Sequence, residues 1–141
     1  MAKATAKKSV RPAVAKQSPA GLVLTVPAMK KGEIYAGIIL NDFPNASGQH
    51  HLILLPGDVS MKWADATAWA KKQGGDLPTR KEQALLFANA AEAFEQRYYW
   101  SSEVHAGGAD CAWVQYFGDG YQYLVRKDLE YRARAVRRVA I

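Results

Sequence analysis

The sequence predicts an α+β fold in which two helices pack on antiparallel sheets, preceded by a disordered basic N-terminal arm. Three observations predict this class. Two apolar runs flank a turn-rich loop near residues 35–55, two helical patterns follow, and the last third alternates strand-like runs with glycine-containing turns. Helices and strands that occupy separate parts of a chain are typical of α+β domains.

Composition limits the kind of protein this can be. The chain has 141 residues, 49% of them hydrophobic and 23% charged, as expected of one globular domain. Its apolar runs reach about seven residues, whereas a membrane-spanning helix needs roughly 20, so we expect no membrane partner. The basic start lacks the apolar segment of a secretory signal. Because Cys111 is the only cysteine, no internal disulfide can form.

The net charge of +6 is concentrated in one segment. Residues 1–31 contain seven lysines or arginines and no acid, which gives +7. The other 110 residues contain 12 basic and 13 acidic side chains, which gives −1. We therefore divide the chain into a flexible basic arm, residues 1–31, and a C-terminal domain, residues 32–141. The cations that we expect to anchor the arm are Lys3, Lys7, Lys8, Arg11 and Lys16.

The composition of the arm leaves its role open. A segment without aromatic residues cannot bury enough surface to offset the entropy of ordering. The arm can bind an anionic partner, either nucleic acid or the acidic surface of a larger assembly, or it can be only a solubilising terminus. Residues 21–27 are apolar and β-branched, and they can form a short strand on a partner or on the domain.

The domain begins with a predicted hairpin and a first helix. Residues 35–40 and 50–55 are predicted strands on either side of a loop rich in turn residues. Residues 61–73 are predicted to be helical, with the hydroxyl of Ser60 as the N-cap. Apolar residues, two tryptophans among them, recur at helical spacing and predict one buried stripe.

A capping box marks the second helix. The Thr79 hydroxyl can accept from the backbone amide of Glu82, whose carboxylate can reach back to the amide of Thr79. The pattern predicts a helix over residues 80–93. Four predicted strands follow, at residues 98–103, 111–117, 121–126 and 132–139.

The last predicted strand is rich in arginine. Strand alternation would place Arg132, Arg134 and Arg138 on one face and Arg137 on the other. We expect one or two of these side chains to pair with carboxylates such as Glu82 or Asp76 as structural ties. The alternative is a basic patch for an anionic glycan or nucleic acid, which the near-neutral domain disfavours.

Several motifs along residues 33–141 together resemble a known domain family. They are Trp63-Ala64-Asp65-Ala66 with Gly74-Gly75, Leu77-Pro78-Thr79-Arg80-Lys81-Glu82, Tyr99-Trp100-Ser101-Ser102, Ala112-Trp113 with Phe117, and Arg134-Ala135-Val136-Arg137-Arg138. In this order they resemble the family named after the C-terminal domain of a collagen-like bacterial adhesin. The chain is more distantly similar to the formylglycine-generating-enzyme branch of the C-type-lectin-like fold.

The resemblance carries expectations about fold and function. It implies a C-type-lectin-like fold that displays a variable loop surface for ligands. Compact members of this kind resemble proteins encoded in bacteriophage genomes. Copper-binding oxidase members use a cysteine pair, but this chain has one cysteine. Calcium-dependent lectins carry EPN or QPD with WND, and this sequence contains none of the three, so we expect no calcium-dependent sugar binding.

Metal binding and catalysis are not expected, and no cofactor is implied. The potential metal ligands show no short paired spacing; they are His50, His51, His105, Glu103, Asp110 and Cys111. Adjacent histidines in a strand point to opposite faces. Ser101, Ser102, His105 and Asp110 lie close in sequence, but no local motif would aim a serine at a base. The sequence therefore predicts a non-enzymatic protein.

Aromatic residues are the strongest non-random feature of the domain. We expect Trp63, Trp69, Trp100 and Phe117 to fill the core, and others to form a recognition surface. The aromatic set also includes Tyr98, Tyr99, Trp113 and Tyr131. The predicted ligand-binding residues are Glu103, His105, Gln115, Tyr116, Asp119, Tyr121, Gln122 and Tyr123. Tyrosine suits carbohydrate or protein contact because it combines rigid area with a polar tip.

These observations together predict a binding or structural module of a bacteriophage. It would reside in the virion, and in the host cytoplasm before assembly, and it can be a homo-oligomer. Its partner would be a host-surface glycan or protein, or another virion protein in a capsid or tail decoration role. A cytoplasmic effector that binds a host protein or nucleic acid through the basic arm is the alternative. The sequence leaves the ligand, the host and the oligomeric state open.

Overall fold

The computed structural model describes residues 25–40 and 48–141, and within them it contains two α-helices and eight strands. In chain order the elements are β1 (Ile34–Ile39), β2 (His50–Leu54), β3 (Val59–Met61), α2 (Trp63–Lys72), α3 (Arg80–Ala90), the short 3-10 helix η1 (Ala91–Ala93), β4 (Tyr98–Val104), β5 (Cys111–Tyr116), β6 (Gln122–Arg126), β7 (Tyr131–Ala133) and β8 (Val136–Ala140). The predicted α+β class with two helices is confirmed. Residues 1–24, which hold all five predicted anchoring cations, lie outside the described residues.

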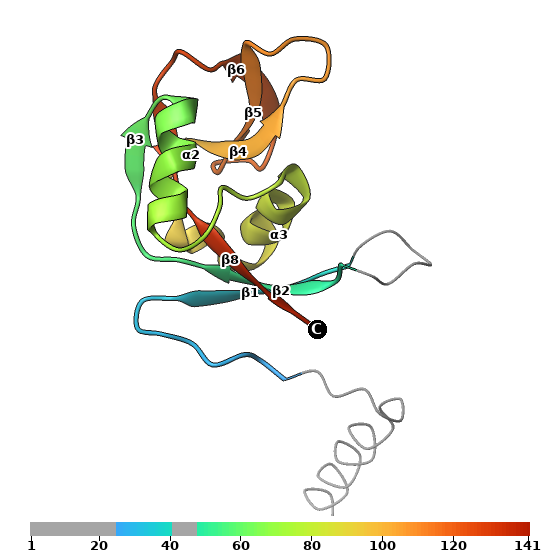
Figure 1. The fold of residues 1–141 in the computed structure, drawn as a ribbon. Helices are drawn as coiled ribbons and strands as arrows, with labels where there is room; N and C mark the ends of the chain where they lie inside the picture. Colours follow the sequence, from blue (N-terminus) through green and yellow to red (C-terminus); the bar gives the residue numbers. More distant parts are fainter. Residues whose placement is uncertain (1–24, 41–47) are drawn as a thin grey trace, which may run out of the picture.

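The strands form two sheets at opposite ends of the domain (Figure 1). The smaller sheet has the order β1-β2-β8, and both of its strand pairs are antiparallel. The predicted pairing of the first two strands is therefore confirmed. The last strand, β8, lies along the other side of β2, so the first and last strands of the domain enclose β2 within one sheet.

The larger sheet has the order β3-β7-β4-β5-β6. Its pairs are antiparallel except for β4 and β7, which meet in parallel at Tyr99 and Arg132. The expectation of purely antiparallel sheets therefore requires one correction. After β4 the chain makes the β5–β6 hairpin on one side, then crosses to add β7 on the other.

The single strand predicted over residues 132–139 is in fact two strands in two sheets. β7 belongs to the larger sheet and β8 to the smaller one. The chain crosses between them at Arg134 and Ala135, where the Leu55 amide donates to the Ala135 carbonyl at 2.9 Å. The Arg134 guanidinium donates back to the Leu55 carbonyl at 2.8 Å. The predicted alternation of arginines fails here because the two strands have separate registers.

The start of the first helix also differs from the prediction. Ser60 is not an N-cap; it lies in β3, opposite Arg132. The helix begins at Trp63, and its N-cap residue, Lys62, makes no side-chain capping bond. The Trp63 amide instead donates to the Lys127 carbonyl at 3.3 Å. Met61, the first residue of the predicted helix, is extended instead, because it pairs with Tyr131 of β7.

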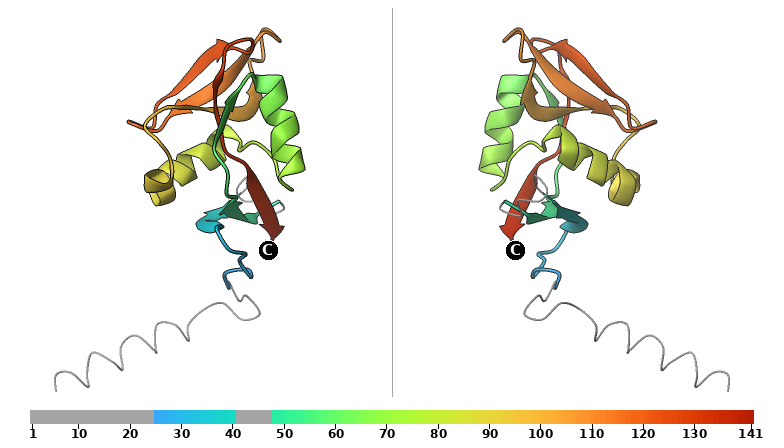
Figure 2. Two further views of the ribbon diagram at one scale, coloured as in Figure 1. Left: turned by 90° about the vertical axis from the view of Figure 1, so that its left-hand side faces the viewer. Right: turned by 90° about the vertical axis from the view of Figure 1, so that its right-hand side faces the viewer.

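Two buried clusters hold the domain together, one for each helix. The first lies between α2 and the larger sheet and includes Ala66, Ala70, Trp100, Ala112, Val114 and Ala133. The second lies against α3 and includes Leu52, Leu54, Leu86, Phe94, Tyr99 and Phe117. Figure 2 shows the helices on either side of the segments that connect the sheets. Trp100 and Phe117 are core residues as predicted, whereas Trp63 and Trp69 are half-buried at the edge of the first cluster.

The described part of the predicted arm contacts the domain. Residues 25–30 form no strand, so the strand predicted over residues 21–27 is absent from 25–27, and its first four residues lie outside the described range. The Ala28 carbonyl accepts a hydrogen bond from Arg137 at 3.1 Å. None of the helices in the described residues is long and apolar enough to span a bilayer.

Candidate functional site

A cluster of four tyrosines lies on one face of the larger sheet. Tyr98 is at its centre, with ring centroids 4.8 Å from Tyr116, 5.8 Å from Tyr123 and 5.8 Å from Tyr131. Tyr98 and Tyr123 each expose 39% of their surface, and the other two are half-buried. We call these four residues the tyrosine patch.

The register of the sheet explains the patch. Tyr98 lies opposite Tyr116 on neighbouring strands, so both side chains project from the same face. Further along that face, α2 packs on Trp100 and Ala133 and buries them. Because side chains alternate along a strand, residues two positions before Trp100 and Ala133 share their face. The patch is the part of that face that lies beyond the core covered by α2.

A pocket of about 470 Å³ opens within the patch. Its lining residues are Ser60, Gln96, Arg97, Tyr98, Tyr116, Glu130, Tyr131 and Arg132. The arginines are already paired: Arg132 contacts Asp58 at 2.8 Å and Glu95 at 3.1 Å, and Arg97 contacts Glu95 at 3.3 Å. The pocket therefore combines aromatic walls with a polar rim in which positive charge is largely neutralised.

One phenol of the patch has a shifted pKa. The pKa of Tyr123 is raised by partial desolvation and by the negative charge of Asp119, with smaller contributions from the neighbouring tyrosines. A phenol hydroxyl can donate as well as accept a hydrogen bond, so the patch offers both kinds of group to a ligand.

A second, more open groove lies on the opposite face of the same hairpin. Its volume is about 740 Å³, and it is lined by Arg80, Lys81, Ala84, Glu103, Gln115, Gly120, Tyr121 and Gln122. The Arg80 guanidinium stacks on Trp113 at 3.5 Å and donates to Gln122 at 2.8 Å. The Glu103 carboxylate accepts from the Arg80 amide at 2.7 Å. These side chains already bind one another, so the groove offers fewer free groups than the tyrosine patch.

The structure divides the eight predicted ligand-binding residues between these places. Glu103, Gln115, Tyr121 and Gln122 line the second groove, whereas Tyr116 and Tyr123 belong to the patch. His105 lies in the loop between β4 and β5, and Asp119 accepts from the Tyr121 amide at 2.9 Å within the hairpin turn.

Gln115, a predicted ligand-binding residue, is placed differently from the prediction. It is completely buried, and its side-chain amide donates to the Gln83 carbonyl at 2.7 Å and accepts from Gln122 at 2.9 Å. Strand alternation correctly predicted that Gln115 shares a face with Trp113. It did not predict that α3 covers Gln115 on that face. Gln115 therefore supports the groove from below and is not an exposed ligand contact.

Sequence reasoning missed several residues of the pocket. Tyr98 and Tyr131 belong to the aromatic set that the sequence highlights, but they come from separate strands and meet only through the sheet order. Gln96, Arg97 and Glu130 lie in connecting segments and carry no local motif. Only the spacing of tyrosines in neighbouring strands could have suggested part of this site.

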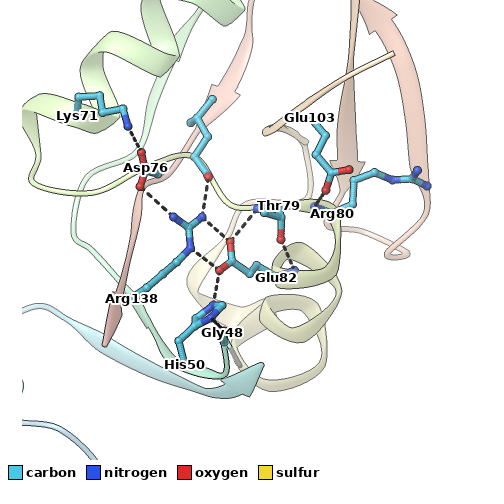
Figure 3. Close-up of polar contacts among 10 residues, drawn as sticks. Gly48, His50, Lys71, Asp76, Thr79, Arg80, Glu82, Glu103 and Arg138 are labelled. Carbon is cyan, nitrogen blue, oxygen red and sulfur yellow. Dashed lines mark hydrogen bonds and ion pairs between the residues drawn. The ribbon is translucent and has the colours of Figure 1, made fainter. Parts of the chain in front are cut away.

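Glu82 is the centre of an ion-pair cluster between the start of α3 and the smaller sheet (Figure 3). Its side chain is 1% exposed and accepts from Arg138 through both oxygens, at 2.7 and 2.8 Å. The predicted capping box is confirmed: Glu82 also accepts from the Thr79 amide at 2.8 Å, and its own amide donates to the Thr79 hydroxyl at 3.1 Å. His50 contacts the same carboxylate at 2.7 Å.

The charges in this cluster explain why Glu82 stays ionised. Burial alone would raise the pKa of Glu82, but hydrogen bonds from Arg138, from the Thr79 amide and from His50 hold it below its usual value. Arg138 also contacts Asp76, which pairs with Lys71. The predicted tie between Arg138 and Glu82 or Asp76 is thus present. Both carboxylate oxygens of Glu82 are engaged, so the cluster joins α3 to the smaller sheet.

The other polar candidates form contacts within the domain. His50 and His51 point to opposite faces as predicted, His50 to Glu82 and His51 to the Tyr35 hydroxyl at 2.8 Å. Ser101 is buried, and its hydroxyl accepts from the Glu103 amide. Within residues 25–40 and 48–141, no group of three or more histidine, cysteine or acidic side chains is arranged to hold a metal ion.

Comparison with known proteins adds no relative. No protein-family model matches the chain, and a search of curated proteins finds no match. The tyrosine patch and the motifs of the sequence are therefore the features that bear on function.

Proposed function

We propose that this protein is a non-enzymatic recognition module with a C-type-lectin-like fold, associated with a bacteriophage virion. The fold proposal is supported by the order of hairpin, two helices and strand-rich half, together with the first and last strands lying in one sheet on either side of β2. The motifs that resemble the adhesin-domain family lead to the same fold. The virion assignment rests on that resemblance and on the basic arm.

The observation that carries the binding proposal is the pocket in the tyrosine patch. Its volume of about 470 Å³ is within the range of small-ligand sites, about 300–1,000 Å³. Aromatic faces can pack on the apolar C–H faces of a sugar ring while polar groups at the rim bind its hydroxyls. Among the described residues, Gln96 and Glu130 make no side-chain hydrogen bond, so both remain able to bind a ligand.

The charges of the pocket favour an uncharged glycan over an acidic one. Asp58 and Glu95 already neutralise Arg132, and Glu95 also pairs with Arg97. A carboxylate or phosphate ligand would have to compete with these contacts. We therefore propose that the patch binds a neutral sugar unit of a host-surface glycan. A host-surface protein or another virion protein is an alternative occupant.

Glycan binding can be tested with an array of uncharged bacterial surface oligosaccharides, followed by titration calorimetry with any oligosaccharide that binds. Tyr98→Ala should weaken binding at least about 10-fold because it removes the central aromatic ring. Tyr98→Phe should retain most of the affinity. Tyr121→Ala is the matched control, since Tyr121 is 66% exposed but lines the other groove.

The outcomes distinguish the possible occupants. Loss of binding in Tyr98→Ala, with an unchanged melting temperature, would support the pocket as the glycan site. Equal loss in Tyr121→Ala would assign recognition to the second groove. If no glycan binds but a purified virion protein does so in a Tyr98-dependent manner, the decoration role replaces the receptor-binding role.

The role of the arm is a separate part of the proposal. Seven positive charges within residues 1–31 suit an acidic surface in the virion assembly. Deleting residues 2–20 should then abolish incorporation into particles, as measured by mass spectrometry of purified virions. Absence of the full-length protein from particles would favour the cytoplasmic effector. In that case, nucleic-acid binding that weakens steeply with salt would identify the arm as the contact.

A further inference from the structure

β6 is an end strand of the larger sheet, and no other strand of the described residues pairs with its outer edge. The Tyr116 amide donates to the Tyr121 carbonyl at 2.9 Å, and the Lys127 amide donates to the Asp110 carbonyl at 2.9 Å, so the groups of Tyr121 and Lys127 that form these bonds point toward β5. Hydrogen-bonded pairs alternate along an antiparallel ladder, so the backbone groups of Tyr123 and Val125 also point toward β5. Those of Gln122, Leu124 and Arg126 must therefore point outward. β6 is the last strand of the sheet at the top of the molecule (Figure 1).

The other sheet edges in the described part of the chain are protected. β3 is only three residues long. β1 has a bulge at Gly37, and the Asn89 side chain donates to the Ala36 carbonyl at 2.6 Å. β8 is capped at one end by backbone bonds between Asp76 and Val136 and carries two arginines along its length. Short edges, bulges, charges and covering groups prevent edge-to-edge pairing.

β6 has fewer of these protective features, and they are confined to its end, where the Leu129 amide covers the Arg126 carbonyl at 3.3 Å. It is five residues long, with the sequence QYLVR, and the register across β5 is continuous. Leu124, at its centre, exposes 37% of its surface. Its one charged residue is Arg126, at the end of the strand, which already pairs with Asp128. An uninterrupted, largely apolar edge of this length is suited to pairing with another strand.

We propose that β6 pairs with β6 of a second copy of this chain, antiparallel and centred on Leu124. In this register Leu124 lies opposite the partner's Leu124, and Gln122 lies opposite the partner's Arg126. Like charges therefore do not meet, and Tyr123 lies opposite the partner's Val125. Apolar residues therefore lie opposite apolar residues and no like charges are opposed, as a two-fold contact requires.

Most of the outward backbone groups of β6 find partners in this arrangement. The two Leu124 residues exchange amide and carbonyl bonds across the axis. The Arg126 carbonyl is occupied by the Leu129 amide at 3.3 Å, but the Arg126 amide remains free to donate to the partner's Gln122 carbonyl. The pair would join the two larger sheets into one continuous sheet.

The dimer has a consequence for recognition. Opposite residues of an antiparallel pair project from the same face, so the two-fold axis is perpendicular to the sheet. The two tyrosine patches would then face the same direction. A dimer of this kind could engage two sugar units of one glycan-covered surface, and such linkage raises avidity without new contacts. The dimer itself does not depend on what the patch binds.

The test is the mass of the full chain in solution. Sedimentation velocity between about 1 µM and 1 mM, the range of weak to moderate association, should show a dimer of the 15.5 kDa chain. Leu124→Lys should yield a folded monomer, because it places two positive charges opposite each other. Its melting temperature should equal that of the wild type at concentrations where the wild type is also monomeric. Ile34→Lys is the control, since Ile34 is similarly exposed, at 38%, but lies in β1 of the smaller sheet; it should remain a dimer.

Amide hydrogen exchange adds a second measurement. The Leu124 amide should exchange slowly in the dimer and rapidly in the Leu124→Lys monomer, whereas the Tyr123 amide should stay protected in both. A monomeric wild-type chain throughout this range would overturn the proposal. A dimer that persists in Leu124→Lys would also overturn it, because another surface would then hold the copies together.

Discussion

Replacing Arg138 with methionine should destabilise the domain through Glu82. The substitution retains an apolar stem but removes the cation that contacts both oxygens of a carboxylate that is 1% exposed. Breaking a buried ion pair by removing one partner typically costs 3–5 kcal/mol, since an uncompensated charge remains. Arg138 is itself 31% exposed, and His50 still contacts Glu82, so we expect about 3 kcal/mol, the low end of that range.

The pH dependence of this effect has a definite sign. The pKa of Glu82 is lowered in the folded protein, so its contribution to stability is present above the unfolded value and is lost as pH falls through the folded value. In Arg138→Met, the folded-state pKa of Glu82 rises. The carboxylate then protonates more readily, which relieves the buried charge. The stability difference between wild type and variant should therefore shrink as pH falls from 7 to 3.

Chemical denaturation at several pH values measures this prediction. Near pH 7 a loss of about 3 kcal/mol corresponds to a melting temperature lower by roughly 12 °C for a domain of this size. Arg97→Met is the control because its pair with Glu95 is 65% and 54% exposed, and it should cost less than about 0.5 kcal/mol. Equal losses in the two variants, or a difference that does not change with pH, would refute the role assigned to Glu82.

Two further substitutions test the packing and one buried phenol. Gly75→Ala should lower stability by about 2 kcal/mol, because its Cβ would overlap the Val136 carbonyl, whereas Gly108→Ala has open space and should be neutral in thermal denaturation. Burial and the hydrogen bond to Asp58 raise the pKa of Tyr99 to about 12, so the stability it provides should be lost between pH 10 and 12. Tyr99→Phe should cost about 1–2 kcal/mol at pH 7 and remove that alkaline loss in denaturant titrations; an unchanged alkaline loss would point to another group.

Local signals in the sequence predicted much of the fold. The capping box is formed by two side chains three residues apart, so Thr79 and Glu82 fix the start of α3 without tertiary information. The tie between Arg138 and Glu82 was also foreseeable, because a near-neutral domain with clustered arginines must pair them with its acids. The hairpin of β5 and β6 follows from its glycine-containing turn.

The rest depends on contacts between distant segments. Residues 59–61 become a strand because β7, about 70 residues later, supplies the partner. The predicted strand over residues 132–139 is interrupted at Arg134 because the chain passes there from the larger sheet to the smaller one. Tyr98 and Tyr131 enter the candidate site for the same reason: they are 33 positions apart and become neighbours through sheet order. The periodicity of a strand predicts on which face a side chain lies, but it does not predict which element covers that face. Gln115 is an example, since its burial under α3 could not be predicted.

The ion-pair cluster around Glu82 and the tyrosine patch belong to different sheets. Glu82 and Arg138 bind α3 to the smaller sheet, in which the first and last strands of the domain lie on either side of β2. The tyrosine patch lies on the larger sheet, on a face whose buried part is already secured by Trp100 under α2. Substitutions at Tyr98 should therefore leave the buried charges undisturbed, because the hydrogen bonds of the Glu82 carboxylate are to Thr79, His50 and Arg138 and to no residue of the patch. A scaffold with this arrangement can vary its exposed tyrosines while its fold remains fixed.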